Sequence, residues 1–63
     1  MTSARSRAIA WRRLRIYAHA AANAATLAED YPSSRNEEAL NAAQRELRDA
    51  ARTFAKVWPQ EHA

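Results

Sequence analysis

The clearest pattern along the chain is a seven-residue repeat of apolar side chains in its second half. It consists of two lines offset by three residues, one made of Leu40, Leu47 and Phe54 and the other of Ala43, Ala50 and Val57. Alternating spacings of three and four residues place both lines on one face of an α-helix. The repeat therefore predicts a helix over about residues 35–58 with a two-line apolar seam.

The first half of the chain predicts another helix, over about residues 3–30, with a smoother apolar face. Seven of the eleven residues from 18 to 28 are alanine, the best helix-forming residue. The two lines of this helix are Leu14, Ala21 and Ala28, and Ala10, Tyr17, Ala24 and Tyr31, flanked by Trp11, Ala18 and Ala25 on one side and by Ala20 and Leu27 on the other. Because alanine side chains are short, we expect the second helix to pack closely against them.

Residues 31–34 predict the turn between the helices. Tyr31 precedes Pro32, and a proline ring disfavours the helical conformation of the residue before it. Ser34 with Glu37 three residues later matches the capping box, in which each side chain accepts from the other's backbone amide. We therefore expect Ser34 to be the N-cap of the second helix.

The start of the first helix and the end of the second are predicted by weaker sequence signals. Thr2 or Ser3 can cap the first helix, and Pro59 ends the second helix after Trp58 and leaves a short tail. A turn of about four residues makes the two helices antiparallel neighbours. Residues whose numbers sum to about 65 then face each other, so that Leu40 meets Ala24 and Ala25, and Leu47 meets Ala18.

The predicted fold is therefore all-α, a two-helix antiparallel hairpin within a single domain of residues 1–63. Chains this short rarely gain more than about 3–5 kcal/mol from one core, and two helices contact each other along one strip only. We expect self-association, most simply as a dimer that forms a four-helix bundle. In length and two-helix plan the chain resembles the ROP type of dimeric four-helix bundle, a likeness of architecture that implies no function.

Composition argues against several classes of function. The chain has no cysteine and no glycine, which excludes a disulfide framework, a thiolate zinc site and a glycine-rich phosphate loop. No nucleophile, base and orienting group can be assembled, and two thin helices offer no cleft. We therefore expect no enzyme, no cofactor and no small-molecule substrate. With no apolar run long enough for a membrane span and no evident signal peptide, we expect a cytoplasmic protein.

Charge is unevenly distributed along the hairpin. Residues 1–28 hold five arginines and no acid, whereas residues 29–38 hold four acids against Arg35 alone. The acids suggest a hard-cation site only weakly, because such clusters are usually solvated. Six arginines at the opposite end form a candidate nucleic-acid surface: Arg5, Arg12, Arg13, Arg15, Arg48 and Arg52. The alternative is a solvated face, partly neutralised by Glu46 and Asp49.

A protein-binding surface is the other candidate. Ile9 and Ile16 lie seven residues apart at the edge of the first apolar face, and Trp11 and Trp58 cover the terminal end of the predicted hairpin. We assign these four residues to partner binding and expect a small regulator or inhibitor that binds another protein and itself. The alternative functions are a nucleic-acid-binding regulator and a dimerisation piece of a larger assembly. A helix lying on a membrane is disfavoured, because the second helix needs the same apolar face.

Overall fold

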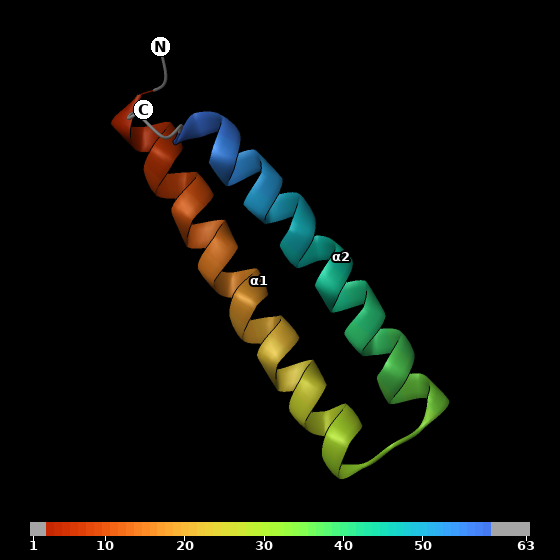
Figure 1. Cartoon of the computed structure of the whole chain (residues 1–63). Helices are drawn as coiled ribbons and strands as arrows, with labels where there is room; N and C mark the ends of the chain where they lie inside the picture. Colours follow the sequence, from red (N-terminus) through yellow and green to blue (C-terminus); the bar gives the residue numbers. More distant parts are fainter. Residues whose placement is uncertain (1–2, 59–63) are drawn as a thin grey trace, which may run out of the picture.

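The computed structural model describes residues 3–58, which form two α-helices joined by a short turn (Figure 1). Helix α1 spans Ala4–Asp30 and helix α2 spans Ser34–Val57, so the boundaries differ from the expected ones by one residue at three of the four helix ends. The described residues contain no strand, and the prediction of an all-helical hairpin is confirmed. The alternative cap Thr2 and the expected tail from Pro59 onward lie outside the described residues.

The stability of helix α1 depends little on favourable charges at its ends. Its N-cap is Ser3, whose Oγ accepts a hydrogen bond of 3.1 Å from the backbone N–H of Ser6. The first turn carries no acid and the last turn carries no base, while Glu29 and Asp30 lie at the negative end of the helix dipole, where acids are mildly unfavourable. The high helix propensity of alanine and the packing against α2 therefore sustain this helix.

The N-cap of α2 corrects the sequence-based expectation. Ser33, not Ser34, is the cap, and its Oγ accepts from the backbone N–H of Asn36 at 3.1 Å. The third helical position is thus occupied by Asn36 rather than Glu37, and no Ser34–Glu37 capping box forms. This register places the Asn36 amide where it reaches back to the end of α1, donating to the carbonyl of Tyr31 at 2.7 Å.

Both helices end in the same way, before a proline. Tyr31 caps α1 with φ −134° and ψ 75°, and Trp58 caps α2 with φ −131° and ψ 69°. Each cap residue still donates its backbone N–H four residues back, to the carbonyls of Leu27 and Phe54. The next residue in the sequence is proline in both cases, which disfavours helical backbone at the cap.

The two-line seam of each helix is its buried side. The buried or half-buried positions of α1 are Arg7, Ala10, Leu14, Tyr17, Ala21, Ala24 and Ala28, and those on the seam of α2 are Asn36, Leu40, Ala43, Leu47, Ala50, Phe54 and Val57. Ala18 and Ala25, expected opposite Leu47 and Leu40, are exposed, as is Tyr31. A pair of helices covers only a narrow strip of each helix surface, so side chains beside that strip stay exposed to solvent.

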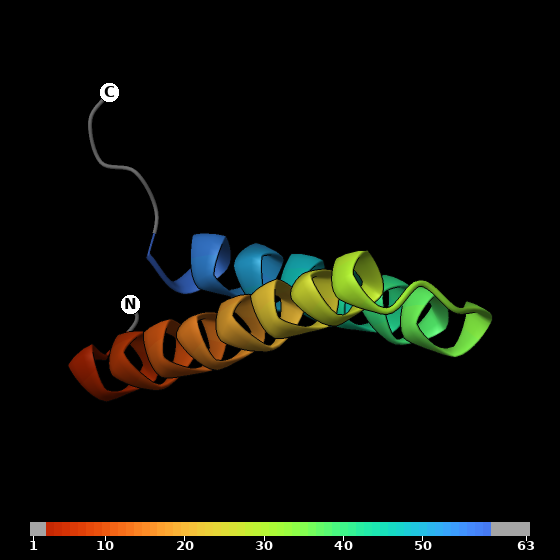
Figure 2. The same cartoon turned by 90° about the horizontal axis from the view of Figure 1, so that it is seen from below.

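The hairpin is one helix thick. It measures 45 × 22 × 14 Å, and a helix with its side chains is about 10–12 Å across. Figures 1 and 2 show α1 and α2 running side by side along the rod, with a shallow crossing. The buried residues among those described are alanines only, and no large side chain there is fully buried. The hairpin thus has a seam rather than a core.

Candidate protein-binding faces

An aromatic cluster joins the helices at their terminal end. The ring of Phe54 lies between two tryptophans, with centroids 5.6 Å from Trp11 at an interplanar angle of 47° and 5.6 Å from Trp58 at 20°. The guanidinium carbon of Arg7 lies 5.2 Å from the centroid of the Trp58 ring, within the range of a cation–π interaction. The number pairs 11/54 and 7/58 both sum to 65, which confirms the expected antiparallel alignment at this end.

This cluster borders an open, apolar hollow of about 470 Å³. Its lining consists of Ala4, Arg7, Ala8, Trp11 and Trp58. The two tryptophans remain 47% and 49% exposed although they pack around Phe54. Large aromatic side chains that stay half exposed beside a hollow are typical of surfaces that bind another macromolecule.

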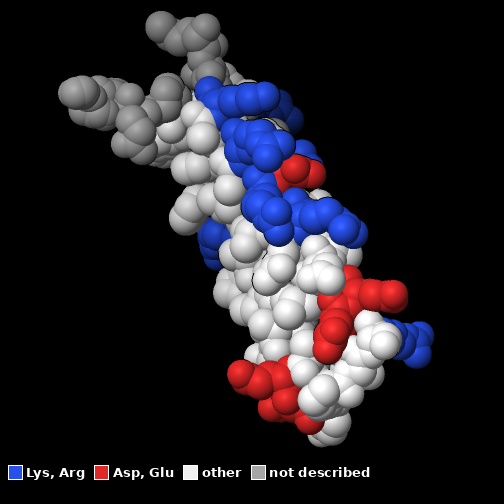
Figure 3. Space-filling view, turned by 45° about the vertical axis from the view of Figure 1, so that its right-hand side comes forward, with Lys and Arg blue, Asp and Glu red and all other residues white. Residues whose placement is uncertain are grey.

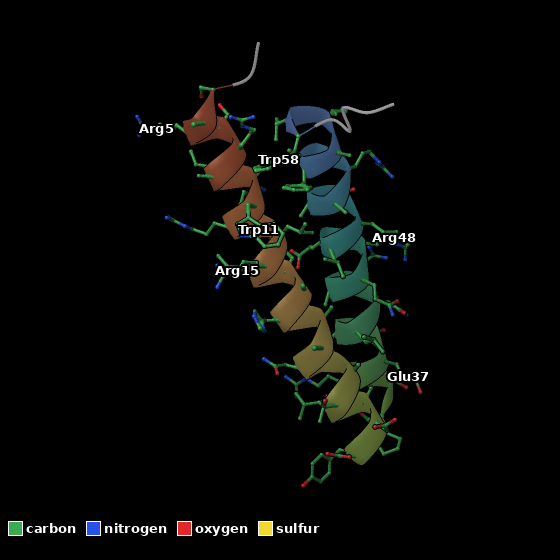
Figure 4. All side chains as sticks on the ribbon, turned by 60° about the vertical axis from the view of Figure 1, so that its left-hand side comes forward. Arg5, Trp11, Arg15, Glu37, Arg48 and Trp58 are labelled. Carbon is green, nitrogen blue, oxygen red and sulfur yellow. The ribbon has the colours of Figure 1, made fainter. Side chains whose placement is uncertain are left out.

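The hollow is part of a longer surface, which we call the tryptophan face. It contains Trp11 and Trp58 together with seven exposed alanines that helical spacing places on the same side of the hairpin: Ala4, Ala8, Ala18, Ala22, Ala25, Ala51 and Ala55. Figure 4 shows the two tryptophans toward the terminal end of this side, with Arg15 extending from the α1 edge and Arg48 from the α2 edge. The face is therefore smooth and apolar along most of its length, except near the turn, where Glu29 lies on the same line of α1 as Trp11, eighteen residues or five turns away.

The predicted isoleucines lie elsewhere. Ile9 and Ile16 are 48% and 56% exposed, and a two-residue step along a helix turns by about 200°, which puts Ile9 on the opposite side of α1 from Trp11. Exposed Ala20 and Leu27 follow on that opposite side. We call Ile9, Ile16, Ala20 and Leu27 the isoleucine strip. The four predicted partner-binding residues thus belong to two surfaces rather than one, and Leu27 is a member that their seven-residue spacing did not reveal.

Positive and negative side chains are concentrated at opposite ends of the hairpin. The terminal half, residues 3–17 and 48–58, holds eight cationic side chains and one acid, or +7. The turn half, residues 18–47, holds two cations and five acids, or −3. Figure 3 shows this on one face, with Lys and Arg gathered toward the terminal end and acids toward the turn. We call these two regions the basic end and the acidic end.

The six predicted nucleic-acid-binding arginines share an end but not a face. Arg5 and Arg12 lie on the side of α1 away from α2, and Arg52 lies on the side of α2 away from α1, as helical spacing requires. Arg52 pairs at 3.7 Å with Asp49, both well exposed, an arrangement that contributes little to stability.

The remaining three arginines lie between these sides. Arg15 and Arg48 are at the edges of the tryptophan face (Figure 4). Arg13 lines a smaller hollow of about 130 Å³ together with Glu46 and Asp49, so acids accompany it. The cations therefore surround the basic end instead of forming one continuous phosphate track.

Other kinds of site find no support in the part of the chain described. His, Asp and Glu side chains of residues 3–58 do not gather in groups of three that could hold a metal ion. Neither α1 nor α2 combines the length and the apolarity needed to cross a membrane. Comparison of this chain with models of protein families, with curated proteins and with solved structures finds no match.

Proposed function

We propose that this chain is a small, non-enzymatic interaction protein, a regulator or inhibitor that binds another protein and associates with itself through its apolar faces. The observation that carries the proposal is that no large side chain among residues 3–58 is fully buried. Stable domains bury the apolar faces of two or more packed layers of secondary structure against each other. This hairpin supplies one layer, so a second layer from another chain is the expected complement.

Two separate surfaces allow two separate contacts. The tryptophan face spans both helices and suits a broad contact with a second helical layer. The isoleucine strip lies on α1 alone and presents apolar residues at positions 9, 16, 20 and 27, a spacing that suits a single partner helix. We assign self-association to the tryptophan face and target binding to the isoleucine strip.

The test combines the mass in solution with capture of a target. The C-terminally tagged protein is examined by sedimentation equilibrium and is then used to capture proteins from a native lysate at low and at moderate salt. We expect a dimer and one dominant protein that remains bound at moderate salt, because apolar contacts are screened little by ions. A monomer that captures no protein contradicts the proposal.

A pair of variants locates the target surface. Ile16→Asp places a charge in the centre of the isoleucine strip and is expected to abolish capture of the dominant protein. His19→Asp places the same charge on the exposed side of α1 away from α2 and serves as the matched control. If both variants capture the target equally well, the isoleucine strip is not its binding site.

The charge of the basic end favours a second candidate function, nucleic-acid binding. Eight cations against one acid in the terminal half provide a phosphate-attracting field. If six arginines neutralise phosphates, affinity should fall by about three orders of magnitude or more between 50 and 200 mM salt. Titration of fluorescent duplex and single-stranded oligonucleotides at these two salt concentrations tests this. A salt-insensitive titration, or no binding at low salt, removes the candidate.

A further inference from the structure

We propose that the partner on the tryptophan face is a second copy of this chain, lying antiparallel, so that the basic end of each copy covers the acidic end of the other. This arrangement rests on the self-association proposed above and specifies its face and its direction. It is a closed two-fold dimer, with the symmetry axis crossing the rod near its middle and with α1 of one copy packed on α1 of the other.

The direction follows from the charge along the rod. A parallel pair of rods would place two ends of +7 together, whereas an antiparallel pair places each +7 end on a −3 end. The halves of a 45 Å rod lie farther apart than the Debye length of about 8 Å at physiological ionic strength. Repulsion between distant like ends is therefore screened, and attraction between adjacent opposite ends decides the direction.

Shape favours the same direction. The tryptophan face is thick at the terminal end, where Trp11 and Trp58 project, and thinner toward the turn, where it carries alanines and Glu29. Because α1 spans residues 4–30, its midpoint falls next to Ala18. A two-fold axis at this midpoint places Trp11 of one copy opposite Ala25 of the second copy. Antiparallel pairing thus sets the bulky end of each face on the smooth end of the other, whereas parallel pairing would set the tryptophans against each other.

Charges at the rim are compatible with this contact. Arg15 and Arg48 extend outward from the edges of the face (Figure 4), where they stay solvated when the middle is covered. Toward the acidic end, Glu37 lies at the edge of the face and Glu29 lies on it, both at the level that the basic end of the second copy would occupy.

Single-cysteine cross-linking tests the arrangement, because the natural chain has no cysteine. The positions Ala8, Ala18, Ala20 and Ala25 are all exposed, so substitution there leaves the seam intact. Each variant is first confirmed as folded by circular dichroism and is then treated with a short bismaleimide. Ala18→Cys is expected to form covalent dimers, because the two copies of this position meet near the symmetry axis. Ala20→Cys, at the same level on the opposite side of α1, is the matched control and should stay monomeric on a denaturing gel.

Cysteines near the ends of α1 distinguish antiparallel from parallel pairing of the two copies. Ala8 lies ten residues from the midpoint, so two copies of Ala8→Cys would be about 30 Å apart along an antiparallel pair and should not cross-link. A mixture of Ala8→Cys and Ala25→Cys should give a heterodimer. Cross-linking of Ala8→Cys to itself, or of Ala20→Cys in place of Ala18→Cys, overturns the arrangement while leaving self-association intact. A monomeric mass in sedimentation equilibrium overturns both.

Discussion

The side-chain amide of Asn36 donates a hydrogen bond of 2.7 Å to the backbone carbonyl of Tyr31, and this bond ties the beginning of α2 to the end of α1. The same nitrogen lies 3.5 Å from the carbonyl of Leu27. The carbonyl of Leu27 already accepts from the backbone N–H of Tyr31, so the amide of Asn36 adds a second donor at the end of α1 and supplies a partner for the carbonyl in the turn. Since residues 31–33 alone separate the helices, this contact helps to fix their relative position.

Replacing Asn36 with alanine should lower the free energy of unfolding by about 1 kcal/mol. A hydrogen bond of this kind contributes about 0.5–1.5 kcal/mol net, and alanine recovers a few tenths through its better helix propensity. Urea unfolding followed by circular dichroism, at one fixed protein concentration, measures the change. Asn41→Ala, at an exposed position of the same helix, is the control and should be neutral or slightly stabilising. Equal effects of the two variants would contradict the role assigned to Asn36.

The buried alanines set the distance between the helices. Ala21 is 9% exposed and lies on the seam, so Ala21→Leu forces the helices apart. We expect a destabilisation of about 1–3 kcal/mol, the usual effect of overpacking. Ala20→Leu adds the same atoms at the adjacent exposed position and should change stability by less than about 0.5 kcal/mol. Thermal melting of the two variants, side by side, distinguishes the seam from the surface.

Leu47 lies on the central part of the α2 seam, where it is half buried. Leu47→Ala should cost about 2 kcal/mol, the lower end of the range for buried leucines, because part of this side chain is already exposed. In so small a protein that loss should lower the melting temperature by several degrees or more. Leu27→Ala removes the same atoms from a side chain that is 51% exposed and should be much milder. If Leu47→Ala melts like the natural protein, the seam is assigned to the wrong residues.

Self-association and target binding should be separable by mutation. Ala18→Asp buries a charge in the middle of the proposed antiparallel interface and should shift the mass measured by sedimentation toward that of the monomer, because an unpaired charge is costly to remove from water. Ile16→Asp lies on the other side of α1 and should leave the mass of the dimer unchanged. A dimer that survives Ala18→Asp but dissociates with Ile16→Asp would reverse the assignment of the two faces.

Local signals in the sequence anticipated most of the fold. Prolines at positions 32 and 59 predicted both helix ends, because the effect of a proline on the preceding residue is local and steric. The spacing of Leu40, Leu47 and Phe54 likewise predicted the buried side of α2. The N-cap of α2 was predicted wrongly as Ser34, because Ser34 and Glu37 match the spacing of a capping box, whereas the structure uses the hydroxyl of Ser33. With Ser33 as the N-cap, the side chain of Asn36 also donates a hydrogen bond to the carbonyl of Tyr31.

The candidate sites were less predictable. Arg7 belongs to none of the candidate sites predicted from the sequence, yet its guanidinium lies over the ring of Trp58, fifty-one residues away in the sequence. The spacing of Ile9 and Ile16 indicated an exposed strip, but their separation from Trp11 and Trp58 depends on how each helix is rotated about its axis. That rotation is fixed when the two seams meet.

Two helices, a turn beginning at Tyr31 and Pro32, an alanine-lined seam and an uneven distribution of charge all follow from the sequence alone. These features depend on side-chain entropy, proline sterics and helical periodicity, all of which act within a few residues. The position of Phe54 between Trp11 and Trp58, and the hollow that the two tryptophans border, follow only from how the two helices pack. Such contacts join residues far apart in the chain, and their geometry depends on the rotation and spacing of both helices at once.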